Sequence, residues 1–236
     1  MLDHGPGSRG QDRPGDVVVI VAVAGGKGGV GKTTVALNLG YALEAVVVDA
    51  DLGMADLPAS RGPDLHDVLA GRANPIEAVR EGGPVDLLPC GRSIAGAHAA
   101  EVTALVAALD RVDRAYGRVV VDCPAGMAAD AGLPLFAAGA CVLVTTPERF
   151  VLPDALRTWA LATELDAGIV GVVLNRAGPD PPVDRIEHVL GAPATVIPES
   201  GAVARATSTG RPVATLSDGT AAERFEDLAS AVDRCA

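Results

Sequence analysis

Runs of consecutive apolar residues recur along the chain and predict buried strands. They occupy residues 17–24, 45–49, 118–122, 140–146, 169–175 and 194–199, and residues 85–88 form a weaker seventh run. The runs are continuous rather than alternating, which is typical of strands covered on both faces of a parallel sheet. None approaches the roughly 20 residues that a membrane-spanning helix needs.

Helical periodicity fills much of the sequence between these runs. Apolar positions spaced for one helix face occur over residues 33–44, 101–114, 154–165 and 221–232. Strands that alternate with helices predict βαβ units, and therefore a three-layer α/β/α domain around a mostly parallel, twisted sheet. We expect one domain over residues 17–236. Residues 1–16 are expected to form a flexible tail, and because they lack the apolar stretch of a secretory signal, a cytoplasmic location is expected.

Composition agrees with a folded domain and limits its partners. Hydrophobic residues make up 49% of the 236 residues and aromatics only 3%, which predicts a sizeable aliphatic core and excludes a disordered chain. The net charge of −11 has the opposite sign from that of a general binder of nucleic acid or anionic membrane.

The acidic surface is also poor in lysine. Such a surface suits a high-salt cytoplasm, such as that of a halophilic archaeon. The Debye length is about 3 Å at 1 M salt, so repulsion between the acidic side chains is weak there. A GC-rich genome would favour the same residues, and the sequence leaves both explanations open. The four cysteines and four histidines show no ligand spacing, so we expect free, mostly buried thiols and no transition-metal site.

A glycine-rich segment between the first strand and the first helix carries the most specific motif. Residues 25–34 read GGKGGVGKTT, and Gly26, Gly31, Lys32 and Thr33 satisfy the spacing G-x-x-x-x-G-K-[ST] of a phosphate loop. Glycines let backbone N–H groups approach phosphate oxygens, Lys32 supplies a compact charge, and the Thr33 hydroxyl suits Mg²⁺. The assigned nucleotide-binding residues here are Gly26, Lys27, Gly28, Gly29, Val30, Gly31, Lys32, Thr33 and Thr34.

Carboxylates follow two other predicted strands. Asp122 comes at the end of RVVVD, the Walker B pattern of a carboxylate that holds Mg²⁺, usually through water. Asp49 is the last residue of the run AVVVD, and Asp51 lies two residues after it. Open α/β sheets bind ligands at this carboxyl end of their strands. Aspartates in a turn or cap are the alternative interpretation of this pair.

Lys27 adds a second lysine inside the loop, and these are the two lysines of the whole chain. The segments GKGGVGKT, VVVDAD and DCPAG resemble the deviant Walker A motif, switch and Walker B region of the MinD/ParA family of ATPases. That resemblance implies binding of ATP and Mg²⁺ and an ATP-dependent homodimer. Lys27 would reach across the dimer interface to the partner's nucleotide.

The resemblance also implies roles for other residues. Asp51 would orient the attacking water, and Thr33, Asp49 and Asp122 would lie at the metal. Asn175, in VVLNR and followed by Arg176, would hydrogen-bond adenine, and Pro198 and Glu199, in IPES, would flank it. A plain strand-end asparagine is the alternative interpretation of Asn175. With Lys27 and Lys32, Asp51 completes the expected catalytic set.

Two departures from the family pattern concern switching and partners. Asp56 replaces the asparagine that often ends the switch, and residues 57–63 look shortened. The amphipathic segment at 221–234 is acidic, unlike the basic membrane-attaching helix of some members, so we expect Phe225, Leu228 and Val232 to pack on the core.

The resemblance implies a slow ATPase that switches by dimerisation and positions a division machine, a chromosome or a similar structure, together with an unidentified protein activator or cargo. No sequence feature indicates direct nucleic-acid binding. Two other functions stay open: a metabolic enzyme on the same fold, such as an ATP-dependent ligase or kinase, and a nucleotide-binding regulator that hydrolyses nothing.

Overall fold

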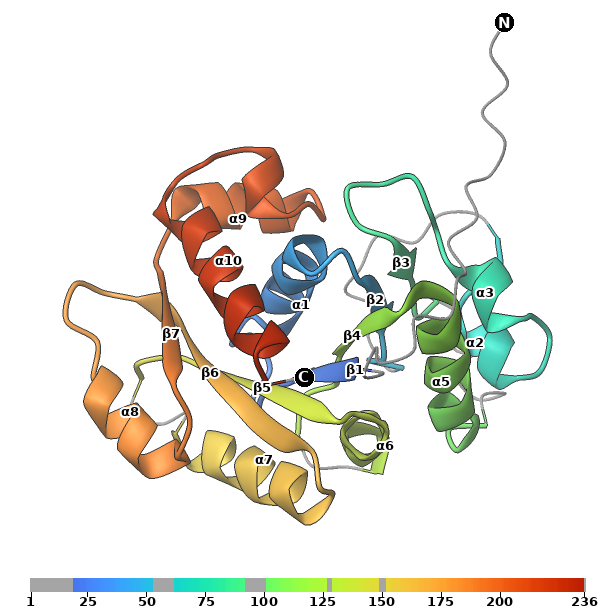
Figure 1. Ribbon diagram of the computed structural model, residues 1–236, viewed down its shortest axis with the longest axis horizontal. Coiled ribbons are helices and arrows are strands. Elements are labelled where there is room, and N and C mark those ends of the chain that lie inside the picture. The colour runs from blue at the N-terminus through green and yellow to red at the C-terminus, as the bar shows by residue number, and fades with distance from the viewer. Residues whose placement is uncertain (1–18, 53–61, 92–100, 127–128, 149–151, 236) are drawn as a thin grey trace, which may run out of the picture.

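A computed structural model describes residues 19–52, 62–91, 101–126, 129–148 and 152–235. The expected tail at 1–16 and the departure at Asp56 lie outside these ranges. Seven parallel strands form one sheet (Figure 1). The strands are β1 (Val19–Ala24), β2 (Val46–Asp49), β3 (Leu87–Leu88), β4 (Arg118–Asp122), β5 (Ala140–Thr145), β6 (Gly168–Ala177) and β7 (Ala194–Pro198).

The strand order places β1 at the middle of the sheet. The order is β3-β2-β4-β1-β5-β6-β7, so the chain builds one half of the sheet and then crosses β1 to build the other. In open α/β sheets, ligands bind beyond the carboxyl ends of the strands at such a crossing point. The topology therefore directs attention to the loop after β1 and to the ends of β4 and β5.

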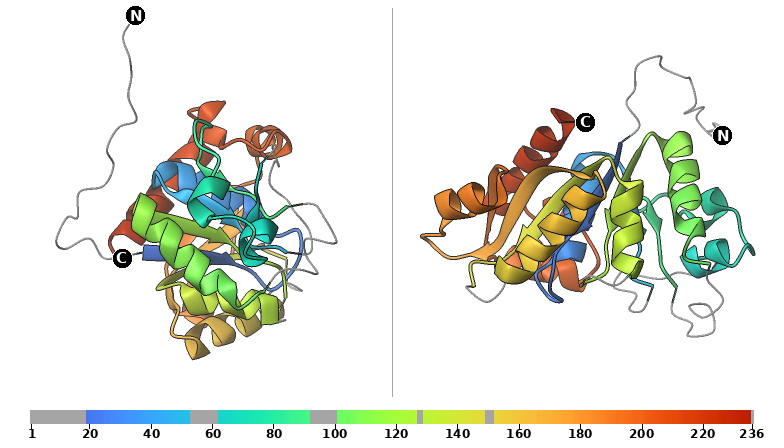
Figure 2. Two further views of the ribbon diagram at one scale, coloured as in Figure 1. Left: turned by 90° about the vertical axis from the view of Figure 1, so that its right-hand side faces the viewer. Right: turned by 90° about the horizontal axis from the view of Figure 1, so that it is seen from below.

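Helices cover both faces of the sheet (Figures 1 and 2). Buried residues of α1, α9 and α10 form one core with one sheet face, whereas α2, α3, α5 and α6 pack on the other, and α7 and α8 extend that second layer. The helices are α1 (Lys32–Ala42), α2 (Leu65–Leu69), α3 (Pro75–Ala78), α5 (Ala104–Tyr116), α6 (Ala129–Ala137), α7 (Leu152–Glu164), α8 (Val183–Leu190), α9 (Gly201–Ser208), α10 (Thr220–Asp233) and the 3-10 turn η1 (Val213–Thr215).

The central strand shows why the apolar runs are continuous. Val21 and Val23 of β1 pack in the core below α1 and α10, while Ile20, Ala22 and Ala24 pack in the core of the opposite layer. Both sets must be apolar because neither face of the strand meets water. The predicted three-layer α/β/α architecture is confirmed, and the sheet is parallel throughout.

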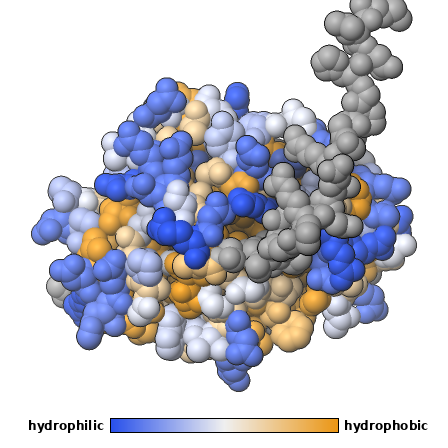
Figure 3. Space-filling view, in the orientation of Figure 1, coloured by the Kyte–Doolittle hydropathy of each residue, from blue (hydrophilic) through white to orange (hydrophobic). Residues whose placement is uncertain are grey.

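The C-terminal helix packs as its amphipathic pattern predicts. Phe225, Leu228 and Val232 on α10 are almost fully buried against the core that contains α1. Hydrophilic residues dominate the surface over α9 and α10 in Figure 3. In the described part of the chain, no helix is long and apolar enough to cross a membrane.

The four cysteines are free thiols, as expected. Cys90, Cys123 and Cys141 are buried and Cys235 is exposed. The expectation of mostly buried thiols is therefore confirmed.

Candidate functional site

The glycine-rich loop lies between the end of β1 and the start of α1, close against the backbone of β5 and α7. Gly31, the residue before α1, has a φ of 101°, a region that favours glycine. A Cβ on Gly25 would lie 2.7 Å from the Val144 carbonyl of β5, and one on Gly26 would clash with the Asp154 carbonyl of α7. These close approaches explain why side chains are excluded from this part of the loop.

The two lysines of the loop differ in their surroundings. Lys32 is buried, with 8% of its surface exposed, whereas Lys27 is exposed. Burial raises the pKa of the Cys123 thiol at the end of β4, and the nearby Lys32 ammonium opposes that rise. Lys32 therefore serves the interior of the site, beside β4, and Lys27 faces away from the protein's own core.

Two buried carboxylates lie side by side next to the loop. Asp49 and Asp122 are paired in register at the ends of β2 and β4, and their exposed fractions are 0% and 1%. The backbone N–H of half-buried Asp51 donates to Asp49 Oδ1 at 3.2 Å. Carboxylates such as those of Asp49 and Asp122, and a hydroxyl such as that of Thr33 in the first turn of α1, are hard oxygen donors of the kind that suit Mg²⁺.

A cavity of about 400 Å³ collects the residues expected at the base. Asn175 and Arg176 at the end of β6, and Pro198 and Glu199 at the end of β7, line it together with Thr34 of α1. The structure thus brings together positions that are far apart in sequence. Thr34 ends the phosphate-loop motif and also lines the cavity, so the cavity adjoins the loop.

Asn175 also makes a contact that the sequence did not predict. Its Nδ2 donates to the Val30 carbonyl of the phosphate loop at 2.8 Å, and the side chain is buried. A Cβ on Gly31 would clash with this Nδ2. Asn175 therefore fixes the loop to β6, and glycine at position 31 leaves room for it.

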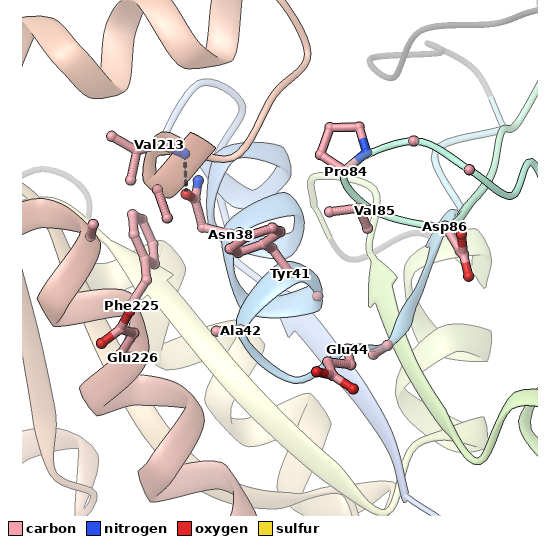
Figure 4. Close-up of a pocket in the computed structure, with 16 residues that line it drawn as sticks. Asn38, Tyr41, Ala42, Glu44, Pro84, Val85, Asp86, Val213, Phe225 and Glu226 are labelled. Carbon is pink, nitrogen blue, oxygen red and sulfur yellow. Dashed lines mark hydrogen bonds between the residues drawn. The ribbon is translucent and has the colours of Figure 1, made fainter. Parts of the chain in front are cut away.

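A second cavity, of about 720 Å³, lies at the other end of α1 (Figure 4). Glu44, Asp86 and Glu226 line it, and the described lining residues include no lysine or arginine. Because three carboxylates would repel a polyphosphate, this larger cavity does not suit a nucleotide. Asn38 closes one side of it by accepting a hydrogen bond from the Val213 N–H at 2.7 Å.

Three buried polar side chains near the strand ends were not identified from the sequence. Thr145 and Thr146, at the end of β5 beside the loop, are buried, and their hydroxyls have no hydrogen-bond partner in the described part of the chain. His66 of α2 is buried against Leu52, just after Asp51. The TT pair was visible in sequence but matched no motif, and His66 lies in a helix too short to show periodicity.

The arrangement fits a polyphosphate with a divalent cation. The glycine loop excludes Cβ atoms, a buried ammonium lies beside it, and buried carboxylates follow on two neighbouring strands. Such a set can bind phosphate oxygens through backbone N–H groups and lysine, and a cation through oxygen ligands. Among the described residues, no three histidine, cysteine, aspartate or glutamate side chains form a group that could hold a metal by themselves.

Comparisons with known proteins agree with this geometry. The model of the CobQ/CobB/MinD/ParA nucleotide binding domain matches residues 21–213. An uncharacterized ATP-binding protein of Methanocaldococcus jannaschii is 32% identical over 91% of this chain and 87% of its own length. The cell division ATPase MinD of Pyrococcus furiosus has a similar structure, with a TM-score of 0.87 and 32% identity over 93% of this chain and all of that one.

A further solved structure carries a nucleotide. It is the septum site-determining protein MinD of Pyrococcus horikoshii, which is complexed with Mg-ADP. Its TM-score is 0.86 at 31% identity, over 92% of this chain and 96% of that one. The chain therefore belongs to the CobQ/CobB/MinD/ParA family, as a P-loop ATPase domain of the MinD/ParA type.

Proposed function

We propose that this protein is an ATP-dependent dimerisation switch. It binds ATP and Mg²⁺ at the loop between β1 and α1, pairs with a second copy, and separates after slow hydrolysis. The observation that carries this proposal is the contrast between buried Lys32 and exposed Lys27 within one loop. One lysine serves the site of its own subunit, and the other is free to serve a partner's.

Each residue of the site has a role in this proposal. Lys32 and the loop N–H groups bind the β- and γ-phosphates, and the Thr33 hydroxyl and the Asp122 and Asp49 carboxylates hold Mg²⁺, directly or through water. Asp51 orients the attacking water. The bound cation would neutralise charge that develops on the phosphates.

The cavity between α1, β6, β7 and α9 receives the base. Asn175 Nδ2 uses one of its two N–H groups on the Val30 carbonyl, and its Oδ1 can accept a hydrogen bond from the adenine amino group. Pro198 and Glu199 also line the cavity, as does Arg176, which is exposed. A volume of about 400 Å³ is within the range of small-molecule sites, about 300–1,000 Å³.

Lys27 acts in trans in this proposal. Its ammonium reaches the nucleotide bound by the partner copy and stabilises charge in the transition state. Fingers supplied in this way by arginine contribute about 10³–10⁵ in rate, and a similar order is expected here. Hydrolysis is therefore slow in the monomer and depends on the dimer.

The biological output we propose is spatial positioning in the cytoplasm. Solved relatives of similar sequence are described as cell division and septum site-determining proteins. By extension, the ATP-bound dimer of this protein engages a division machine, a chromosome or a comparable structure. An unidentified protein activator or cargo completes the cycle.

Three variants test the switch by size-exclusion chromatography with ATP or ADP and by phosphate release, in low and in molar salt. Lys32→Ala abolishes ATP binding. Lys27→Ala retains binding but loses dimerisation and turnover, and Asp51→Ala stays dimeric with ATP. Arg185→Ala, an exposed position with the same charge change, is the control for Lys27. Native turnover in Lys27→Ala would refute the role in trans.

The alternative function is that of a metabolic enzyme, because the matching family model covers CobQ and CobB as well as MinD and ParA. Such an enzyme needs an acceptor beside the γ-phosphate, so its ATP turnover would depend on a small added substrate. A regulator that hydrolyses nothing would instead form a stoichiometric ATP complex without phosphate release over hours. Phosphate release by the protein alone, lost in Lys27→Ala, excludes both.

A further inference from the structure

His66 links two segments at the edge of the candidate site. It belongs to α2, and only 3% of its surface is exposed. Its Nε2 lies 3.2 Å from the Leu52 carbonyl oxygen and 3.4 Å from Cys90 Sγ. Leu52 is the residue after Asp51, so the imidazole contacts the segment that carries the proposed water-orienting carboxylate.

The helix that carries His66 is firmly placed. The backbone N–H groups of Leu65 and His66 donate to the Pro89 and Cys90 carbonyls at 2.8 and 3.1 Å. A reciprocal capping box between Asp64 and Asp67 completes the first turn of α2. These bonds attach α2 to the chain just after β3, so the imidazole extends from a fixed base.

The contacts of His66 determine which ring nitrogen carries the proton. A carbonyl oxygen only accepts hydrogen bonds, so a bond to Leu52 requires the proton on Nε2. Nδ1 is buried and has no hydrogen-bond partner in the described part of the chain. A proton on Nδ1 would leave that buried N–H without an acceptor, and the Leu52 carbonyl would lose its bond from Nε2. The form with the proton on Nε2 is therefore favoured.

Cys90 is a secondary neighbour in this arrangement. Burial, reinforced by nearby carboxylates including those of Asp49 and Asp51, raises the pKa of its thiol, so Cys90 is neutral. A neutral sulfur beside an Nε2–H group is a weak acceptor. The bond to the Leu52 carbonyl therefore provides most of the attachment.

The Asp51 segment is held on both sides of the carboxylate. Before it, the Ala50 N–H donates to the Asp122 carbonyl of β4 at 3.0 Å. After it, the Leu52 carbonyl accepts the bond from His66. Removing the second bond leaves the Leu52 carbonyl without this donor and loosens the segment that carries the Asp51 carboxylate.

We infer that His66 is a positioning residue for Asp51: its Nε2–H, held by α2, fixes the Leu52 carbonyl and thereby sets the place of the Asp51 carboxylate during ATP hydrolysis. This inference rests on the proposed function, which gives Asp51 its role with water. His66 itself touches no reacting atom. It acts on the rate of hydrolysis and not on the binding of nucleotide.

Four variants test the inference by steady-state phosphate release. His66→Leu removes the donor, and His66→Gln restores a donor near the position of Nε2. In His66→Asn the side chain is too short for its amide to reach the Leu52 carbonyl. We expect kcat to fall about ten- to hundredfold in the Leu and Asn variants, because a small misplacement of a catalytic group has effects of that order. Val68→Ala, which loosens the packing of α2 but leaves the His66 donor in place, is the control.

Comparing the change in kcat with the change in KM distinguishes a positioning role of His66 from a general loss of structure. KM for ATP is expected to stay within about twofold in every variant, since none touches the nucleotide. His66→Gln and Val68→Ala should retain the native kcat within about threefold. The inference is overturned if His66→Leu hydrolyses at the native rate, or if Gln rescues no better than Asn. If His66→Leu does not fold, the Gln–Asn comparison decides.

Hydrogen–deuterium exchange without nucleotide distinguishes failure of this inference from failure of the proposed function. Amides of residues 50–52 should exchange faster in the Leu and Asn variants than in the native protein and in His66→Gln. If the native protein releases no phosphate but the variants differ in exchange as expected, the proposed hydrolysis is contradicted and the attachment of Leu52 to His66 is supported. Identical exchange in all variants contradicts the attachment.

Discussion

The contact between Gly31 and Asn175 offers a quantitative test of how the phosphate loop is held. The two residues are far apart in sequence but close in the fold. A Cβ at position 31 would clash with Asn175 Nδ2, the atom that donates to the Val30 carbonyl. Replacing either residue by alanine therefore breaks the same hydrogen bond. The two substitutions are expected to be strongly non-additive.

The geometry sets the magnitudes. Asn175→Ala leaves the buried Val30 carbonyl without its donor, which costs about 1–3 kcal/mol. Gly31→Ala forces a Cβ into a left-handed conformation at φ 101°, about 1–2 kcal/mol, and also displaces Nδ2, which loses the same bond. Its total is about 2–5 kcal/mol on the same estimates.

The double variant loses the bond only once. Its expected cost is about 2–5 kcal/mol, whereas the sum of the single costs is about 3–8 kcal/mol, which leaves a coupling of about 1–3 kcal/mol. Urea unfolding of the nucleotide-free proteins, followed by circular dichroism, measures all four stabilities. Arg176→Ala, at the exposed neighbouring position, is the control and should leave stability nearly unchanged. Additivity within about 0.5 kcal/mol would refute the proposed shared contact.

Three further predictions concern other parts of the molecule. Phe225→Ala should cost about 3–5 kcal/mol of unfolding free energy, whereas Phe136→Ala, 61% exposed, should change it by less than about 0.5 kcal/mol; equal effects in urea melts would contradict the packing of α10. Burial, helped by Asp110, raises the pKa of Asp113 above its usual value, so the native state holds the proton more tightly and loses stability as pH rises through the native pKa. Asp113→Asn should therefore be stabilising at pH 7 and lose that gain at pH 3–4, and a gain that is the same at both pH values would count against this carboxylate. Asp122→Asn should weaken the Mg²⁺ dependence of ATP binding in fluorescence titrations, and an unchanged magnesium response would remove Asp122 from the proposed metal site.

The strands were predictable because burial on both faces leaves a clear signature. The run at 118–122 gave both ends of β4, whereas β2 begins one residue later than expected, and β6 and β7 differ by one or two residues from expectation. The weak run at 85–88 became the two-residue strand β3. A strand at the edge of the sheet is covered less completely, so its hydrophobic signal is weaker.

Several helices were not predictable for physical reasons. Helices α2 and α3 have five and four residues, which is too short for a period of 3.6 to repeat. Helix α6 contains Pro134, a residue that normally ends a helical pattern. The long helices α1, α5, α7 and α10 were predicted, with ends that differ by one to three residues.

The sequence pointed to residues of the candidate site more readily than to the contacts between them. Glycine spacing identified the loop, and the base-cavity residues, identified by resemblance, do line one cavity. The bond from Asn175 to Val30 spans 145 residues, and His66 reaches Leu52 from a separate helix, so neither leaves a local pattern. The different burial of Lys27 and Lys32 likewise arises from the folded loop and not from their shared residue type.

Calorimetric titration of the protein with Mg·ATP tests the central claim most directly. The loop between β1 and α1 should give a single binding step with one nucleotide per chain, absent in Lys32→Ala and unchanged in Glu44→Gln, which alters the second cavity. No heat of binding in the native protein, or equal binding in Lys32→Ala, would contradict the claim.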